Sequence, residues 1–179
     1  MAQPQAAEMF PQSLKGLSRG TALSVLLRLY GLCFAPRRTP SGELELAVMP
    51  SEGTKSPWNL GWPFPEDRGR DKVAPNLFKT VNVHLVDQPL ADVMQAASDS
   101  IEIPVLLDYA GMREWRINHP EIRVNFGPKQ TTWGLAIKHI AFQSRLRREL
   151  YVDEAGKPFV WITPIEFKRK PTAAEKRRN

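Results

Sequence analysis

The stretch VNVHLVDQPLADVMQAASDSIEIPVLL, residues 81–107, predicts a strand, a turn, an amphipathic helix and a second strand with few residues between them. Its first residues alternate between apolar and polar, which is typical of a strand with one buried face. Asp87 is placed to cap the helix, and Pro89 to lie in its first turn. Apolar residues at helical spacing then predict one buried stripe: Leu90, Val93, Met94, Ala97 and Ile101.

The segment that follows predicts a third strand, a second helix and a hairpin. EIRVNF, residues 121–126, is the strand, and Thr131 or Thr132 can supply the hydroxyl that caps the helix. DEAG, residues 153–156, is a short hairpin loop in which Gly156 can take a positive φ. The predicted buried stripe of this helix comprises Trp133, Ala136, Ile137, Ile140 and Ala141.

Together these elements predict an α+β fold with the order β-α-β-β-α-β-β over residues 79–165, in which two helices pack on small sheets. Part of the pattern recurs 114 residues earlier, since Ala22, Leu23, Leu26 and Leu27 fall on Ala136, Ile137, Ile140 and Ala141, and Gly42 falls on Gly156. Residues 11–50 are therefore predicted to be a partial repeat of the unit, with the second helix and the hairpin but without the β-α-β beginning.

Composition divides the rest of the chain. Residues 1–10 are a predicted disordered start, and residues 51–78 form a linker rich in Pro, Gly and Trp that we expect to pack on a domain surface. The net charge is +6, and residues 166–179 contain six Lys or Arg against two Glu, so we expect a basic, disordered tail. No apolar run is long enough to span a membrane, and no signal peptide is visible.

The hydrophobic pattern resembles the short N-terminal domain of secretins and TonB-dependent receptors. The similarity lies in VDQPLADVMQAASDSIEIPVLLD, residues 86–108, and in a later block, and the full unit covers about half of the chain. The later block matches at Val124, Phe126, Trp133, Ala136, Ile137, Ile140 and Leu146. The resemblance implies a non-enzymatic module in the periplasm or cell envelope that packs against like domains or envelope components. Without a visible signal peptide, the cytoplasm stays open.

No pattern in the sequence predicts catalytic, cofactor-binding or metal-binding residues. His84, His119 and His139 fall on different predicted elements and lack the spacing of a metal site. We expect His84 to face solvent and His139 to be partly buried beside Phe142. The acidic pairs, Asp99 with Glu102 and Asp153 with Glu154, are expected to be solvated, because acid–base catalysis needs contrasting environments in a pocket. The single cysteine, Cys33, is expected to be a small buried residue.

Two surfaces are candidates for binding. Phe159 and Trp161 alternate with Val160 and Ile162, so both faces of the last strand are apolar and one needs a cover: the Trp-rich linker, the partial repeat or another chain. From this we predict a protein interaction surface of Phe159, Trp161, Trp58 and Trp62. The alternative is a nucleic-acid-binding module that contacts phosphates through the basic tail and through Arg145, Arg147 and Arg148.

Overall fold

The computed structural model describes residues 10–65 and 67–165, and it has the α+β fold with small sheets that the sequence predicts. The predicted disordered start, apart from Phe10, and the predicted basic tail lie outside the described residues. None of the helices within the described ranges is both long and apolar enough to cross a membrane.

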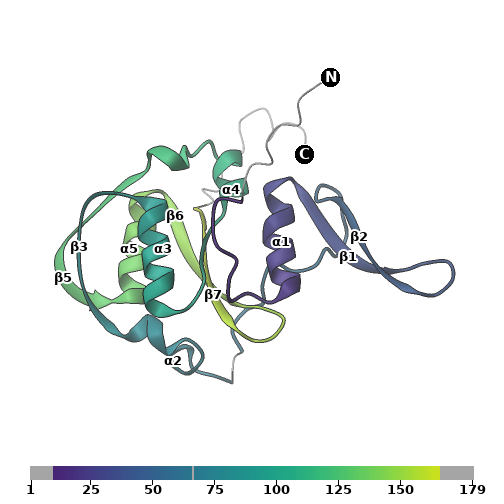
Figure 1. Cartoon of the computed structure of the whole chain (residues 1–179), viewed down its shortest axis with the longest axis horizontal. Coiled ribbons are helices and arrows are strands. Elements are labelled where there is room, and N and C mark those ends of the chain that lie inside the picture. Colours follow the sequence, from purple (N-terminus) through teal and green to yellow (C-terminus); the bar gives the residue numbers. More distant parts are fainter. Residues whose placement is uncertain (1–9, 66, 166–179) are drawn as a thin grey trace, which may run out of the picture.

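The C-terminal module comprises residues 80–164 and contains two small sheets (Figure 1). Strands β3 (Thr80–Pro89) and β5 (Arg123–Thr132) form an antiparallel ribbon. The second sheet has the order β4-β7-β6, with β4 parallel and β6 antiparallel to β7. Its strands are β4 (Val105–Leu107), β6 (Leu146–Val152) and β7 (Pro158–Pro164).

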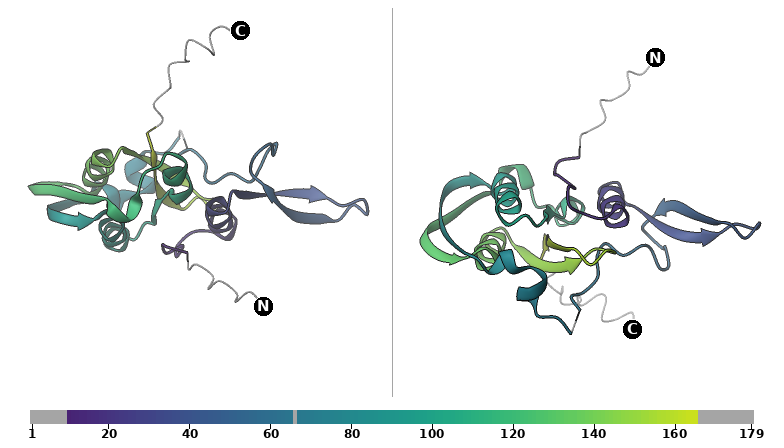
Figure 2. Two further views of the ribbon diagram at one scale, coloured as in Figure 1. Left: turned by 90° about the horizontal axis from the view of Figure 1, so that it is seen from above. Right: turned by 60° about the horizontal axis from the view of Figure 1, so that its bottom comes forward.

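Two amphipathic helices, α3 (Leu90–Ile101) and α5 (Trp133–Gln143), lie between the ribbon and the sheet (Figures 1 and 2). Thr132 caps α5, where its hydroxyl accepts a hydrogen bond from the Leu135 amide at 3.4 Å, as the sequence predicts. A short helix that the sequence pattern did not predict, α4 (Tyr109–Glu114), follows β4. Asp108 caps α4 by accepting a hydrogen bond from the Gly111 amide at 2.9 Å. A single 3-10 turn, η2 (His119–Glu121), leads into β5.

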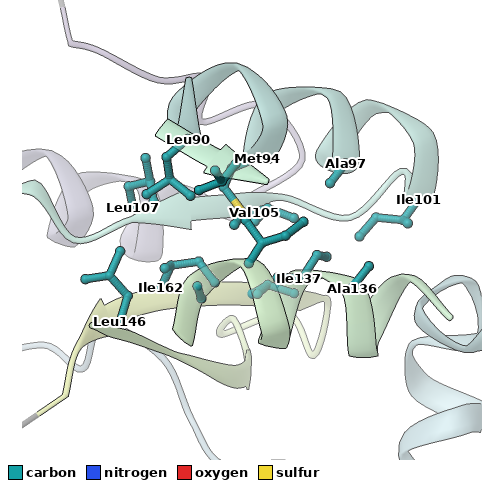
Figure 3. Close-up of a cluster of buried hydrophobic side chains, with 14 of the residues drawn as sticks. Leu90, Met94, Ala97, Ile101, Val105, Leu107, Ala136, Ile137, Leu146 and Ile162 are labelled. Atoms are coloured by element: carbon teal, nitrogen blue, oxygen red, sulfur yellow. The ribbon is translucent and has the colours of Figure 1, made fainter. Parts of the chain in front are cut away.

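The core of the module lies where the two helices face each other over β4 and β7. Figure 3 shows Met94 of α3 and Ile137 of α5 pointing toward each other across Val105. The predicted structural residues Leu90, Met94, Ile137 and Ile140 are buried in this cluster. Trp133 is only partly buried and packs against its edge.

The prediction that Asp87 caps α3 is wrong. Strand β3 continues to Pro89, so Asp87 lies within the strand, at an irregularity in its pairing with β5, and has a φ of 48°. Its amide donates to the Asn125 side chain at 2.9 Å. Strand pairing at this point outweighs the local preference of Asp for a helix cap, and α3 begins directly after Pro89 without a capping side chain.

The N-terminal unit, residues 19–50, is a helix followed by a hairpin: α1 (Arg19–Leu29), β1 (Leu32–Arg38) and β2 (Leu44–Pro50). The bounds of these three elements, moved by 114 residues, are the bounds of α5, β6 and β7. Gly42 and Gly156 occupy the same place in the two hairpin loops and have φ values of 86° and 75°. The β1–β2 hairpin protrudes from the end of the molecule opposite the β3–β5 ribbon (Figure 1).

The segment between the two parts packs on the C-terminal module, as expected for the linker. Trp62 pairs with Val152 at the outer edge of β6 through hydrogen bonds of 2.9 and 3.0 Å. Further on, α2 (Arg70–Val73) and the 3-10 helix η1 (Pro75–Phe78) bring Ala74 and Leu77 into the core of the module. This segment is therefore part of the packed structure.

Candidate interaction surfaces

Phe159 and Trp161, predicted to form an exposed contact surface, are buried within the chain itself. They lie on the face of β7 opposite the main core. Phe159 is 0% exposed and Trp161 is 5% exposed. Val25 of α1 and Leu106 of β4 complete this second cluster, and Leu14, Leu17, Leu60 and Phe10 pack around it. The prediction is therefore wrong for these two residues: residues 10–17, α1 and the linker cover this face within the chain.

Trp58 and Trp62 are partly buried and pack next to the cluster of Phe159 and Trp161. Trp58 stacks on Phe34 of β1 with ring centroids 5.3 Å apart and meets Trp62 edge to face at 5.9 Å. Next to them, Gly61 lies so close to Phe159 that an added Cβ would come within 2.6 Å of that ring. The two tryptophans thus join the hairpin, the linker and the sheet, so only part of their surface faces solvent.

Two carboxylates in the β6–β7 loop hold the start of α1. Asp153 accepts a hydrogen bond from the Ser18 amide at 2.8 Å. Glu154 accepts from the amides of Gly20 and Thr21 and from the Thr21 hydroxyl. The first amides of a helix have no partner within the helix, and its N-terminus carries a partial positive charge. The two carboxylates satisfy both, so the loop acts as a cap supplied from a distant part of the chain.

The sequence-based expectation that this acidic pair is solvated is wrong for Asp153, which is buried, while Glu154 is exposed and still binds the start of α1. Burial acts to raise the pKa of Asp153, but hydrogen bonds from Ser18, Lys157 and Ala155 outweigh it, and the pKa lies below its ordinary value. Burial also acts to raise the pKa of Glu154, but hydrogen bonds from Thr21 and Gly20 outweigh it, so this pKa too lies below its ordinary value. Both groups are therefore stabilised as anions in the folded chain.

A buried carboxylate at the end of β4 makes a second link between the two parts. Both oxygens of Asp108, which is 1% exposed, accept hydrogen bonds from Arg28 of α1, from Nε at 2.9 Å and from Nη2 at 2.8 Å. Thr163 of β7 donates a further hydrogen bond at 3.1 Å. The hydrogen bonds to Asp108 raise the pKa of Arg28, and the pair fixes α1 beside the sheet.

An apolar groove runs between α5 and β5 on the exposed side of the C-terminal module. Its volume is about 710 Å³, and its lining includes Leu135, His139 and Phe142 of α5 and Phe126 of β5. Leu135 is 59% exposed and Phe142 is 70% exposed. His139, predicted to be partly buried beside Phe142, is exposed and meets the Phe126 ring edge to face at 5.2 Å.

This groove occupies the face of α5 that corresponds to the packed face of α1. In α1, Thr21, Ser24 and Val25 are buried against the C-terminal module, and Arg28 reaches Asp108. Moved by 114 residues, these positions are Leu135, Lys138, His139 and Phe142, and all four line the groove. One helix face is thus covered in the N-terminal unit and exposed in the C-terminal module.

A second exposed apolar surface lies on β2, where exposed and half-buried residues alternate and the exposed ones are apolar. Leu44, Leu46 and Val48 are 71%, 59% and 54% exposed. Among the described residues, β2 pairs with β1 alone. Cys33, expected to be buried, is half-buried on this hairpin.

The three arginines of the alternative, nucleic-acid-binding prediction have different surroundings. Arg147 is exposed and pairs with Glu149 at 3.1 Å. Arg148 is half-buried and donates to the Gly134 carbonyl at 2.7 Å; burial lowers its pKa. Arg145 is exposed and has a φ of 58° in the turn before β6. Within the described ranges, the three guanidinium groups therefore do not share one environment.

The three histidines also lie apart. His84 is exposed on β3, as expected, and His119 stacks edge to face on Tyr109 at 4.6 Å, where burial lowers its pKa. In residues 10–65 and 67–165, no three His, Cys, Asp or Glu side chains come together in a way that could hold a metal ion.

Sequence reasoning missed three features of these surfaces: the Arg28–Asp108 pair, the capping loop and the groove on α5. The exposed helix face carried a signal, because Leu135 and Phe142 lie outside the predicted buried stripe. The two links to α1 join residues 80 and 135 positions apart in the chain, which no local pattern predicts. A scan against protein-family models and searches of the curated proteins and of the solved structures gave no match to this chain.

Proposed function

We propose that this protein is a non-enzymatic assembly module that packs against like domains through the groove on α5. The supporting observation is the exposed face of Leu135, His139 and Phe142, which corresponds to the face that α1 packs on the β4-β7-β6 sheet. A large apolar face left in water is typical of a protein–protein contact. The chain thus contains one example of the contact that we propose between chains.

The resemblance to the short N-terminal domains of secretins and TonB-dependent receptors supports the same role. The order of strands and helices over residues 80–164 is compatible with that resemblance, with α4 as an addition. On this basis we propose a place in the cell envelope, with like domains or other envelope components as partners. The resemblance rests on hydrophobic spacing, and the groove supplies the physical reason for association.

The proposal predicts self-association that depends on the groove. Analytical ultracentrifugation of the wild-type chain over a range of concentrations should show a reversible increase in sedimentation coefficient. Replacing two large exposed side chains in Leu135→Ser/Phe142→Ser should weaken association at least tenfold, because each buried side chain of this size contributes about 1.5–3 kcal/mol. Both positions are exposed in the single chain, so folding should be little affected.

Val86→Ser is the matched control. Val86 is 62% exposed on β3 and is not part of the groove lining, so this variant should associate as the wild type does. A wild-type chain that sediments as a monomer at every concentration, or equal weakening in the control, would contradict the proposal. High salt should leave the association largely unchanged, since apolar burial and not charge drives it.

The second candidate, nucleic-acid binding, is not favoured by the surroundings of Arg147 and Arg148. A gel-shift assay at low and high salt distinguishes it from the first proposal, because phosphate contacts make affinity fall steeply with salt. We expect no salt-sensitive shift that depends on Arg145.

A further inference from the structure

The β1–β2 hairpin has one protected edge and one open edge. On the outer edge of β1, Pro36 has no amide hydrogen, and the Trp58 amide donates to the Phe34 carbonyl at 2.7 Å. A proline is one of the usual means by which a strand edge avoids further pairing. Glu45 is the one charged residue of β2, and Leu46 and Val48 of this strand are exposed. Within residues 10–65 and 67–165, no strand pairs with the outer edge of β2.

The C-terminal module shows what covers the corresponding strand. Leu46 and Val48, moved by 114 residues, are Val160 and Ile162 of β7, and both are 0% exposed. There β4 lies parallel to β7, with Val105 opposite Val160 and Leu107 opposite Ile162.

Backbone hydrogen bonds close both ends of this pairing. The Val160 amide donates to the Pro104 carbonyl, and the Asp108 amide donates to the Ile162 carbonyl, each at 2.8 Å. The Leu46 amide and the Val48 carbonyl occupy the corresponding places on β2. They are the backbone groups to which an added parallel strand would bond.

In the C-terminal module, a helix as well as β4 covers Val160 and Ile162. In the C-terminal module, the apolar stripe of α3 packs in the same cluster as Val160, Ile162 and the buried face of α5 (Figure 3). Three residues, 102–104, connect α3 to β4, so helix and strand act as one segment. In the N-terminal unit, Leu23, Leu26 and Leu27 correspond to Ile137, Ile140 and Ala141 but are only partly buried. The described residues of that unit include no counterpart of α3 or β4.

We propose that the N-terminal unit accepts a helix–strand segment of a partner protein. The segment adds a strand parallel to β2 and lays an apolar helix stripe over Leu46, Val48 and α1. Its chemistry follows from α3 and β4: apolar residues at helical spacing, a short turn, then three consecutive apolar residues. This inference rests on the proposed role as an interaction module, but it uses a different surface from the groove on α5.

The test uses a synthetic peptide of residues 87–109 of this chain, which contains the α3 and β4 sequences, as the probe. Amide hydrogen exchange of the full-length, isotope-labelled chain is followed by NMR with and without the peptide. The peptide should slow exchange of the Leu46 amide at least tenfold, because that amide gains a carbonyl partner. Leu46→Lys/Val48→Lys should weaken peptide binding at least tenfold, since it places charge on the apolar face.

Leu135→Lys/Phe142→Lys is the matched control and should bind the peptide as the wild type does. Unchanged exchange at Leu46, or equal loss of binding in both double variants, would overturn the inference. Protection of Leu46 that rises with protein concentration without peptide would also overturn it, because a second copy of the chain would then occupy β2. Groove variants that fail to alter sedimentation would contradict the proposed function. The peptide result would still test this inference, because it depends on β2 and not on the groove.

Discussion

At the level of single residues, Asp153 and Glu154 hold the start of α1, a role that their position in a hairpin loop does not suggest. Acidic residues in a hairpin loop are ordinarily solvated, yet here they accept hydrogen bonds from three backbone amides of a helix start. α1 has no capping side chain of its own and no acidic residue in its first turn. The loop therefore supplies both the hydrogen-bond acceptors and the negative charge that α1 lacks.

This arrangement predicts an acid-sensitive stability. The pKa values of Asp153 and Glu154 are lower in the folded chain than when unfolded. Their contribution is therefore complete above the unfolded pKa of about 4 and is lost as the pH falls through the folded pKa. In urea titrations between pH 6 and pH 3, Asp153→Asn/Glu154→Gln should cost about 1–2 kcal/mol at pH 6 and progressively less at lower pH. A difference between variant and wild type that does not change with pH would contradict this account.

At the level of secondary structure, β7 is the strand on which both parts of the molecule depend. Val160 and Ile162 face the main core, while Phe159 and Trp161 face the cluster closed by α1 and the linker. Alternation along the strand predicts two apolar faces, and it leaves open what covers each of them.

Trp161→Ala should accordingly reduce stability and not association. Removing a buried aromatic side chain leaves a cavity beneath α1 and should cost about 3–5 kcal/mol in the free energy of unfolding. Chemical denaturation followed by circular dichroism measures this loss, and the sedimentation of the folded fraction should match that of the wild type. Near-wild-type stability together with lost association would restore Trp161 as a contact residue.

The elements with clear periodicity could be predicted from the sequence. Helices α3 and α5 have continuous apolar stripes, and β6 and β7 flank a loop whose glycine takes a positive φ. α4 has only six residues and depends on the Asp108 cap, so it is too short to show a period. The position of Asp87 depends on pairing with β5, where Asn125 lies 38 residues later, and such long-range pairing overrides local preference.

At the scale of the whole molecule, the N-terminal unit and the C-terminal module share buried residues. Val25 packs with Leu106, Phe159 and Trp161, and Arg28 pairs with the buried Asp108. From sequence, the recurrence of a helix and a hairpin 114 residues apart could be recognised, since it follows from spacing. The packing of one part on the other could not, because it depends on contacts between distant residues.

This shared core predicts that the chain unfolds in one step. Three of the five tryptophans, Trp58, Trp62 and Trp161, lie where the two parts meet, so tryptophan fluorescence responds to their separation, while far-ultraviolet circular dichroism reports on all helices and strands. The two denaturation curves should coincide, as expected for a two-state transition. Separate midpoints would mean that the N-terminal unit detaches before the C-terminal module unfolds.

The capping role of the β6–β7 loop also bears on where the chain tolerates inserted sequence. Hairpin loops are ordinarily permissive sites for insertion. The two hairpin loops of this chain occupy corresponding positions, but 153–156 is bound to α1 while 40–43 is exposed at the tip of a protruding arm. An epitope tag or a fluorescent label is therefore best placed at Ser41 or Gly42, and one added between Asp153 and Gly156 would displace the start of α1.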